Sequence, residues 1–158
     1  MKIIFLPEYA SAIPNGKTRI TRDKSMLFEP PISTDAFSIY PYHWSFELTT
    51  QKITDNKFLL RYAMGSLCFI QYTNAELVIP KSEQGKIYVV FSESPCGDGF
   101  YYSEYCKFQK KKYFDAKNKI LAVGDVNVSH GKCVEFASGQ FAVIGDSGKL
   151  VAIYVKID

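Results

Sequence analysis

Short apolar runs, broken at close intervals by turn residues, recur along the chain and constrain its fold more than any other feature. The run KIYVVF at Lys86–Phe91 is the clearest strand signal, because it is rich in β-branched and aromatic residues. Gln140–Ile144 and Leu150–Lys156 flank the turn Asp146-Ser147-Gly148 and predict a hairpin. We expect nine or ten such strands, roughly 8–15 residues apart. This spacing predicts a mainly β fold, either a β-sandwich or an open barrel of short antiparallel strands, with one or two short helices.

The remaining strand signals are weaker. Trp44, Phe46 and Leu48 alternate with polar residues, which is the period-2 pattern of a half-buried strand. Other runs predict strands at Lys2–Leu6, which Pro7 would stop, and at Lys17–Thr21, Phe58–Met64, Leu67–Tyr72, Glu76–Ile79, Phe100–Phe108, Ile120–Val123 and Val126–Val128. We expect residues 8–35 to form a wrapped loop with one hairpin, and Pro14-Asn15-Gly16 is a strong turn signal within it.

Two segments leave the choice between strand and helix open. The run from Asn56 to Tyr72 is almost continuously apolar, and Asp55 could cap a helix there. We favour a strand, because turn residues bound the run closely and Gly65 interrupts it. Ser103–Lys112 is the second candidate helix.

Size and cysteine content predict a single globular domain, residues 1–158, that needs no disulfide or metal to fold. A chain of 158 residues buries roughly 68–70% of its unfolded surface. Cys68, Cys96, Cys106 and Cys133 show no C-x2-C spacing, and the apolar run at the N-terminus is too short for a secretory signal. We therefore expect reduced cysteines, with a Cys96–Cys106 bridge as the minor alternative, and a cytoplasmic location. The longest apolar stretch, Phe58–Tyr72, is interrupted and predicts no membrane span.

The residue types that usually carry catalysis are scarce. His43 and His130 are the only histidines, and neither stands in a nucleophile or metal-ligand motif. Glu93, Asp98 and Glu104 surround a tyrosine-rich loop, so an enzyme or sugar-binding domain with an unfamiliar site stays open as a second alternative. The chain has no glycine-rich phosphate loop. We expect no enzyme activity, no metal and no cofactor.

The segment Gly99–Phe114, GFYYSEYCKFQKKKYF, is the candidate binding segment. It concentrates aromatic residues in a chain that already has eleven Tyr and twelve Phe, and it holds the strongest run of lysines. Tyr and Phe supply large contact areas at protein interfaces, and aromatic rings interleaved with cations can also stack nucleic-acid bases. The third interpretation is an edge strand or amphipathic helix whose rings are core and whose lysines protect the edge.

Two resemblances bear on function. Residues 139–154, GQFAVIGDSGKLVAIY, are similar to the closing hairpin of PUA-type RNA-binding domains, over about a tenth of the chain. In general character the chain resembles bacterial immunity proteins, which are small, signal-less and non-enzymatic and neutralise a cognate toxin. The first resemblance implies RNA binding, and the second implies a protein partner.

We therefore expect a non-enzymatic protein-binding domain, in its most specific form an immunity or inhibitor protein that blocks a toxin's active site. The alternative is a module that binds RNA or single-stranded nucleic acid. With a net charge of +3, the sign of the partner's charge stays open. The expected contact residues are the loop acids, the tyrosines and the lysines of this region: Glu93, Asp98, Tyr101, Tyr102, Glu104, Tyr105, Lys107, Lys110, Lys111 and Lys112.

Overall fold

The computed structural model describes residues 2–33, 37–42, 45–67, 72–102, 111–126 and 131–158. These residues form fourteen strands. The strands are β1 (Ile3–Tyr9), β2 (Lys17–Ile20), β3 (Ser25–Glu29), β4 (Phe37–Tyr42), β5 (Phe46–Thr54), β6 (Lys57–Ser66), β7 (Thr73–Asn74), β8 (Ser82–Phe91), β9 (Gly99–Phe100), β10 (Lys112–Asp115), β11 (Ile120–Gly124), β12 (Lys132–Ala137), β13 (Gln140–Ile144) and β14 (Leu150–Lys156). The expectation of a mainly β fold is confirmed.

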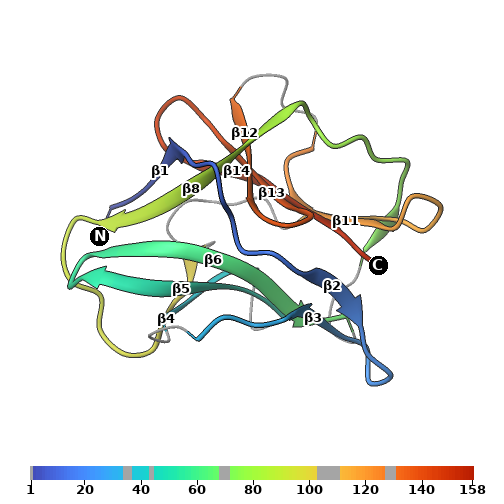
Figure 1. Cartoon of the computed structure of the whole chain (residues 1–158), viewed down its shortest axis with the longest axis horizontal. Coiled ribbons are helices and arrows are strands. Elements are labelled where there is room, and N and C mark those ends of the chain that lie inside the picture. The colour runs from blue at the N-terminus through green and yellow to red at the C-terminus, as the bar shows by residue number, and fades with distance from the viewer. Residues whose placement is uncertain (1, 34–36, 43–44, 68–71, 103–110, 127–130) are drawn as a thin grey trace.

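One sheet connects all fourteen strands and curls into an open half-barrel with two facing layers. The β8 layer contains β1, β8 and β11–β14, and the β5 layer contains β2–β6 (Figure 1). Strand β8 joins the layers, because its start pairs with β12 while its later residues pair with β1 and β6. Most neighbours are antiparallel, and the parallel exceptions are β8 with β12, β4 with β9 and β7 with β10.

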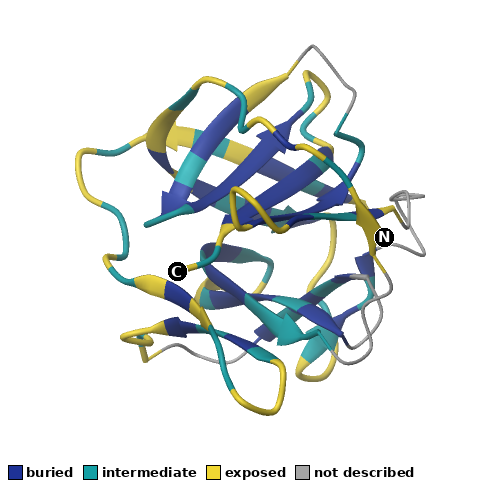
Figure 2. Ribbon diagram, turned by 90° about the vertical axis from the view of Figure 1, so that its right-hand side faces the viewer, coloured by how far each residue is buried: buried dark blue, intermediate teal, exposed yellow. Residues whose placement is uncertain are grey.

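The hydrophobic core lies between the two layers. Buried side chains gather on the strands of both layers, while most exposed residues lie in the connections (Figure 2). A chain of aromatic rings fills one part of this core, where Phe91 contacts Phe37, Phe58 and Phe100 with ring centroids 5.1–5.6 Å apart. Phe37 also stacks on Phe58 at 4.6 Å. Much of the aromatic content that the sequence displays is therefore core packing.

A second, smaller hydrophobic cluster lies on the outer face of the β8 layer. Ile120 and Ala122 of β11 belong to it, whereas Leu121 and Val123 point into the main core. Residues 75–81 pass over this outer face, and Leu77 is buried against it. Because both faces are covered, β11, β13 and most of β14 are apolar without alternation.

The prediction of a strand at Glu76–Ile79 is wrong, because the backbone of this segment hydrogen-bonds to a side chain where a strand would bond to a neighbouring strand. The backbone N–H of Leu77 donates to a carboxylate oxygen of Asp115 at 2.9 Å, in the position where a neighbouring strand would offer a carbonyl. Asn118 donates to the same carboxylate through its backbone N–H at 3.0 Å and its side chain at 2.8 Å. These bonds hold the pKa of Asp115 below its usual value, with the bond from Leu77 the largest cause.

Strand β1 runs through Pro7 to Tyr9, so the expectation that Pro7 stops the strand is wrong. The backbone N–H and C=O groups of even-numbered residues in and beside β1 point toward β8. The N–H of Ser92 donates to the carbonyl of Lys2, and the N–H of Ala10 donates to the carbonyl of Gln84. The N–H of Phe5 points the other way and donates to Gly148 at 2.8 Å. Pro7, like Phe5, is an odd-numbered residue of β1, so a backbone N–H at position 7 would point away from β8 toward the outer edge. Proline can therefore occupy this position without removing a hydrogen bond between β1 and β8.

The helix alternative at Asn56–Tyr72 is wrong over the described part, because Lys57–Ser66 is strand β6, paired along its length with β5. Gly65 fits this pairing, since a side chain there would meet the backbone oxygen of Ser45. The predicted strands at residues 68–71 and 127–128, and the helix alternative at residues 103–110, lie outside the described residues. Strands β4, β7, β10 and β12 were not predicted.

Gln140 links the two layers through its buried amide. Its side-chain oxygen accepts the N–H of Ala63 at 2.6 Å, and its nitrogen donates to the Ala63 carbonyl at 3.0 Å. The same nitrogen donates to the Thr18 hydroxyl at 3.0 Å. The Gln140 side chain thus takes the place of a neighbouring strand at one point on the edge of β6.

Candidate functional site

The structure divides the predicted contact residues into three groups. Four of them, Glu104, Tyr105, Lys107 and Lys110, lie outside the described residues. The two histidines considered for catalysis, His43 and His130, also lie outside them.

Tyr102 and Lys112 are buried. Tyr102 is 0% exposed, meets Phe5 edge-on at 5.2 Å and accepts the Leu150 N–H at 3.1 Å. Lys112 is 8% exposed, because a strand sends successive side chains to opposite faces and β10 turns Lys112 inward. Both residues support the fold, and neither is exposed enough to anchor a partner.

Glu93, Asp98 and Lys111 are exposed, and Tyr101 is half-buried. Glu93 and Asp98 lie on the loop that leads to β9, whereas Lys111 precedes β10. Strands β9 and β10 stand near opposite ends of the strand order. The candidate segment is therefore partly core, and its described exposed residues come from two loops that lead to different strands.

A groove lined by lysines is a polar candidate site among the described residues. It has a volume of about 590 Å³ and lies where four segments meet. Its lining side chains are mainly cationic or neutral polar, and they come from residues Asn15, Gly16, Lys17, Thr18, Lys117, Asn118, Lys119, Ser138, Gly139, Lys156, Ile157 and Asp158. We call it the lysine groove.

Backbone hydrogen bonds hold the four segments together. The end of β14 pairs with the β12–β13 turn, since Lys156 N–H donates to Gly139 at 2.8 Å. One residue on, Ile157 N–H donates to Lys119 in the β10–β11 turn, also at 2.8 Å. Asp158 N–H then donates to Thr18 of β2 at 2.8 Å. These backbone hydrogen bonds therefore fix the backbone positions from which the lysine side chains extend.

The lysine groove carries the whole net charge of the chain. Four lysines and Asp158 give its lining a side-chain charge of +3, which equals the net charge of all 158 residues. Lys17 pairs with Asp158 at 3.4 Å, and Lys156 lies 5.9 Å from the centre of the Phe141 ring. Within the described part of the chain, Lys117 and Lys119 have no ion-pair partner. A concave surface lined by one sign of charge attracts ligands of the opposite sign.

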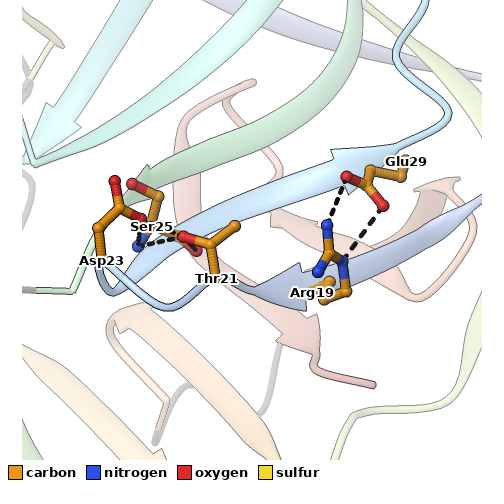
Figure 3. A network of polar contacts seen from close by, with 5 residues as sticks. All are labelled: Arg19, Thr21, Asp23, Ser25 and Glu29. Carbon is orange, nitrogen blue, oxygen red and sulfur yellow. Dashed lines mark hydrogen bonds and ion pairs between the residues drawn. The ribbon is translucent and has the colours of Figure 1, made fainter.

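Arg19 lies on β2 beside the lysine groove but adds little to its charge. Its guanidinium donates twice to Glu29 across the β2–β3 hairpin, at 2.8 and 3.2 Å (Figure 3). This pairing raises the pKa of Arg19 and lowers that of Glu29, in both cases first through the hydrogen bond and then through the opposite charge. At the turn of the same hairpin, Thr21, Asp23 and Ser25 hydrogen-bond one another (Figure 3).

Sequence reasoning missed the lysine groove. Its lysines stand at positions 17, 117, 119 and 156, and only Lys117 and Lys119 are close in the chain. That pair lies in the turn between β10 and β11. The convergence of the other lysines depends on strand pairing between the first and last parts of the chain.

A second groove, of about 520 Å³, runs beside β1 and the β13–β14 turn. An open strand edge can take up an extended peptide as an extra strand. Here Phe5 already bonds to Gly148, and Pro7 offers no N–H. The edge of β1 is therefore protected against strand addition.

Comparisons with known proteins give no relative from which a function could be taken: no family model, no curated protein and no solved structure matches the chain. Among the described residues, no helix has the length and apolar character needed to cross a membrane. The same part of the chain holds no cluster of three or more histidine, cysteine or acidic residues suited to a metal ion. Cys96 and Cys133 are free thiols. Cys106, the second cysteine of the alternative Cys96–Cys106 bridge, lies outside the described residues. Burial first, and then the charge of Glu135, raises the pKa of Cys133 to about 11.

Proposed function

We propose that this protein is a non-enzymatic binding domain that takes an acidic segment of a protein partner into the lysine groove. The observation that carries the proposal is the convergence of Lys17, Lys117, Lys119 and Lys156 from four separate segments. The lining has a side-chain charge of +3, and a concave surface with this excess of positive charge attracts acidic groups. Such complementarity steers association and selects partners by charge.

The chemistry of the lining favours a protein over a nucleic acid. Interfaces with nucleic acid are strongly positive, and single-strand binding relies on exposed aromatic rings that stack bases. The residues lining the lysine groove include no aromatic side chain. Asn15, Asn118 and Ser138 supply hydrogen-bonding groups that suit the backbone and carboxylates of a peptide.

The immunity or inhibitor role is the specific form of this proposal. An inhibitor would cover the partner's active site with the surface around the groove, and an acidic partner face would meet the lysines. A toxin gene beside the gene for this chain would support that role. Association of the purified toxin with this protein, and loss of toxin activity on binding, would test it directly.

The experiment for acidic-peptide binding compares two triple variants. The first carries Lys117→Gln, Lys119→Gln and Lys156→Gln, which leave the ion pair of Lys17 intact. The control variant replaces three exposed lysines elsewhere, with the substitutions Lys2→Gln, Lys81→Gln and Lys149→Gln. Both variants lose the same charge, so they separate a groove from a general charge effect.

Binding of fluorescent polyglutamate and of oligouridylate is measured by anisotropy at low and physiological salt. We expect polyglutamate to bind the unmodified protein and the control variant, and the groove variant to bind about tenfold or more weakly. An equal loss in both variants would refute the groove as the site. Tighter binding of oligouridylate at physiological salt, lost in the groove variant, would replace this proposal with the nucleic-acid alternative.

A further inference from the structure

Strand β6 has a gap along one edge, and a small pocket occupies the gap. Residues 57–59 of β6 pair with β8, Ala63 bonds to Gln140, and residues 65–66 pair with β3. Between the first two contacts, a pocket of about 250 Å³ opens beside residues 59–61. The pocket is mainly apolar, with two cations, and its lining is Ala12, Ile13, Pro14, Leu59, Leu60, Arg61, Gly85, Lys86 and Phe136.

Arg61 occupies a special position in this pocket. In the β5–β6 pairing, Thr49 faces Tyr62 and Thr50 faces Leu60, so Arg61 is an extra residue without a partner on β5. The Nε atom of Arg61 is buried and has no hydrogen-bond partner among the described residues. A buried donor without an acceptor is costly, and the cost is larger for a charged group. Bulges are over-represented next to functional sites, and the bulged residue here lines the pocket.

The charge of the pocket lining also determines which sign of charge a ligand carries. Lys86 adds a second positive charge, and the lining contains no acidic residue. Among the apolar lining residues, Ala12, Ile13 and Pro14 are exposed or half-buried, whereas Leu59, Leu60 and Phe136 are buried beneath them. A cavity of ~150 Å³ can hold benzene, so about 250 Å³ accommodates a ring or a short chain with a charged group attached.

We infer that this pocket binds a small carboxylate with an aromatic or short aliphatic body. The carboxylate accepts hydrogen bonds from the guanidinium of Arg61, the geometry that this planar donor favours. The apolar body lies over the edge of β6 at residues 59–61, and Ala12, Ile13 and Pro14 cover it. The Pro14 carbonyl accepts the N–H of Ser138 at 2.9 Å, which holds the cover in place.

The test titrates the protein with benzoate, using benzamide as a neutral ligand of nearly the same shape. Binding is followed by ¹H–¹⁵N correlation spectra, including the side-chain Nε–H of Arg61, and by the thermal midpoint. The variants are Arg61→Gln and the control Arg22→Gln, which removes an exposed arginine from another part of the chain. A third variant, Ala12→Trp, fills the mouth of the pocket and leaves Arg61 unchanged.

We expect benzoate at millimolar concentration to shift the Arg61 signal and raise the thermal midpoint, and benzamide to do neither. Arg61→Gln should weaken benzoate binding roughly 10- to 100-fold, as loss of a charge-assisted hydrogen bond predicts, and Arg22→Gln should not. If Arg61→Gln does not fold, Ala12→Trp should still abolish binding. Equal binding of benzamide, unchanged binding in Ala12→Trp, or no response to benzoate would overturn the inference. None of these results depends on the lysine groove, whose variants test a separate site.

Discussion

Replacing Gln140 with leucine should destabilise the fold strongly, because one amide serves three buried groups. Ala63 is 0% exposed, and its N–H and carbonyl both bond to the Gln140 side chain. Leucine of similar size would leave both backbone groups without partners, at ~1–3 kcal/mol each. The extra apolar burial would return about 1 kcal/mol. We therefore expect Gln140→Leu to lower the free energy of unfolding by about 1–5 kcal/mol, a large part of the ~5–15 kcal/mol of a typical domain.

Gln140→Glu adds a test with a defined pH dependence. An ionised carboxylate can accept from Ala63 N–H, but it cannot donate to the Ala63 carbonyl, and burial raises its folded-state pKa. The folded state then binds more protons than the unfolded state, so the stability deficit should shrink as pH falls through the raised pKa towards ~4.3.

Urea unfolding followed by circular dichroism measures both variants, with Gln84→Leu and Gln84→Glu as matched controls at an exposed glutamine. The control substitutions should stay within about 0.5 kcal/mol of the unmodified protein. A loss below about 1 kcal/mol for Gln140→Leu, with an unchanged urea dependence, would refute the role given to this amide.

Three further predictions follow from buried or hydrogen-bonded groups. Tyr102→Phe should cost about 1–2 kcal/mol in urea unfolding, because it leaves a backbone N–H of β14 without its acceptor. Because the pKa of Asp115 is lower in the folded than in the unfolded state, its carboxylate stabilises the fold above the unfolded-state pKa, and this contribution disappears as pH falls through the folded-state pKa. Thermal midpoints at several pH values should show this loss for the unmodified protein and not for Asp115→Ala. Buried Cys133, with its pKa near 11, should react slowly with a thiol reagent at pH 8, so Cys133→Ser should leave the fast phase unchanged and Cys96→Ser should remove one fast thiol.

The sequence predicted correctly those strands whose apolar pattern and flanking turn residues lie within a few positions of one another. KIYVVF became part of β8, and the hairpin of β13 and β14 has the predicted bounds. The β2–β3 hairpin also lies within the wrapped loop expected at residues 8–35. In each case adjacent turn residues and apolar content agree, so the tertiary structure did not override them.

Other features depend on contacts between distant parts of the chain. Pro7 was expected to stop β1, because the sequence does not show which way each backbone N–H faces. Glu76–Ile79 resembled a strand, but Leu77 bonds to a carboxylate 38 positions away. The Tyr- and Lys-rich segment was interpreted from composition, although Tyr102 and Lys112 are buried. The lysine groove assembles only when β2 meets the end of the chain beyond β14, which no short-range pattern encodes.

Strand β8 belongs to both layers, and this shared membership determines how the protein can come apart. Detaching β8 removes the partner of β1, β6 and β12 at the same time. Partial opening that spares one layer is therefore disfavoured, and amide protons of β8 should exchange with solvent only when the whole chain unfolds. A cut in residues 92–98 would leave β12 on a fragment that lacks β8. Two such fragments would have to associate before either could complete its sheet.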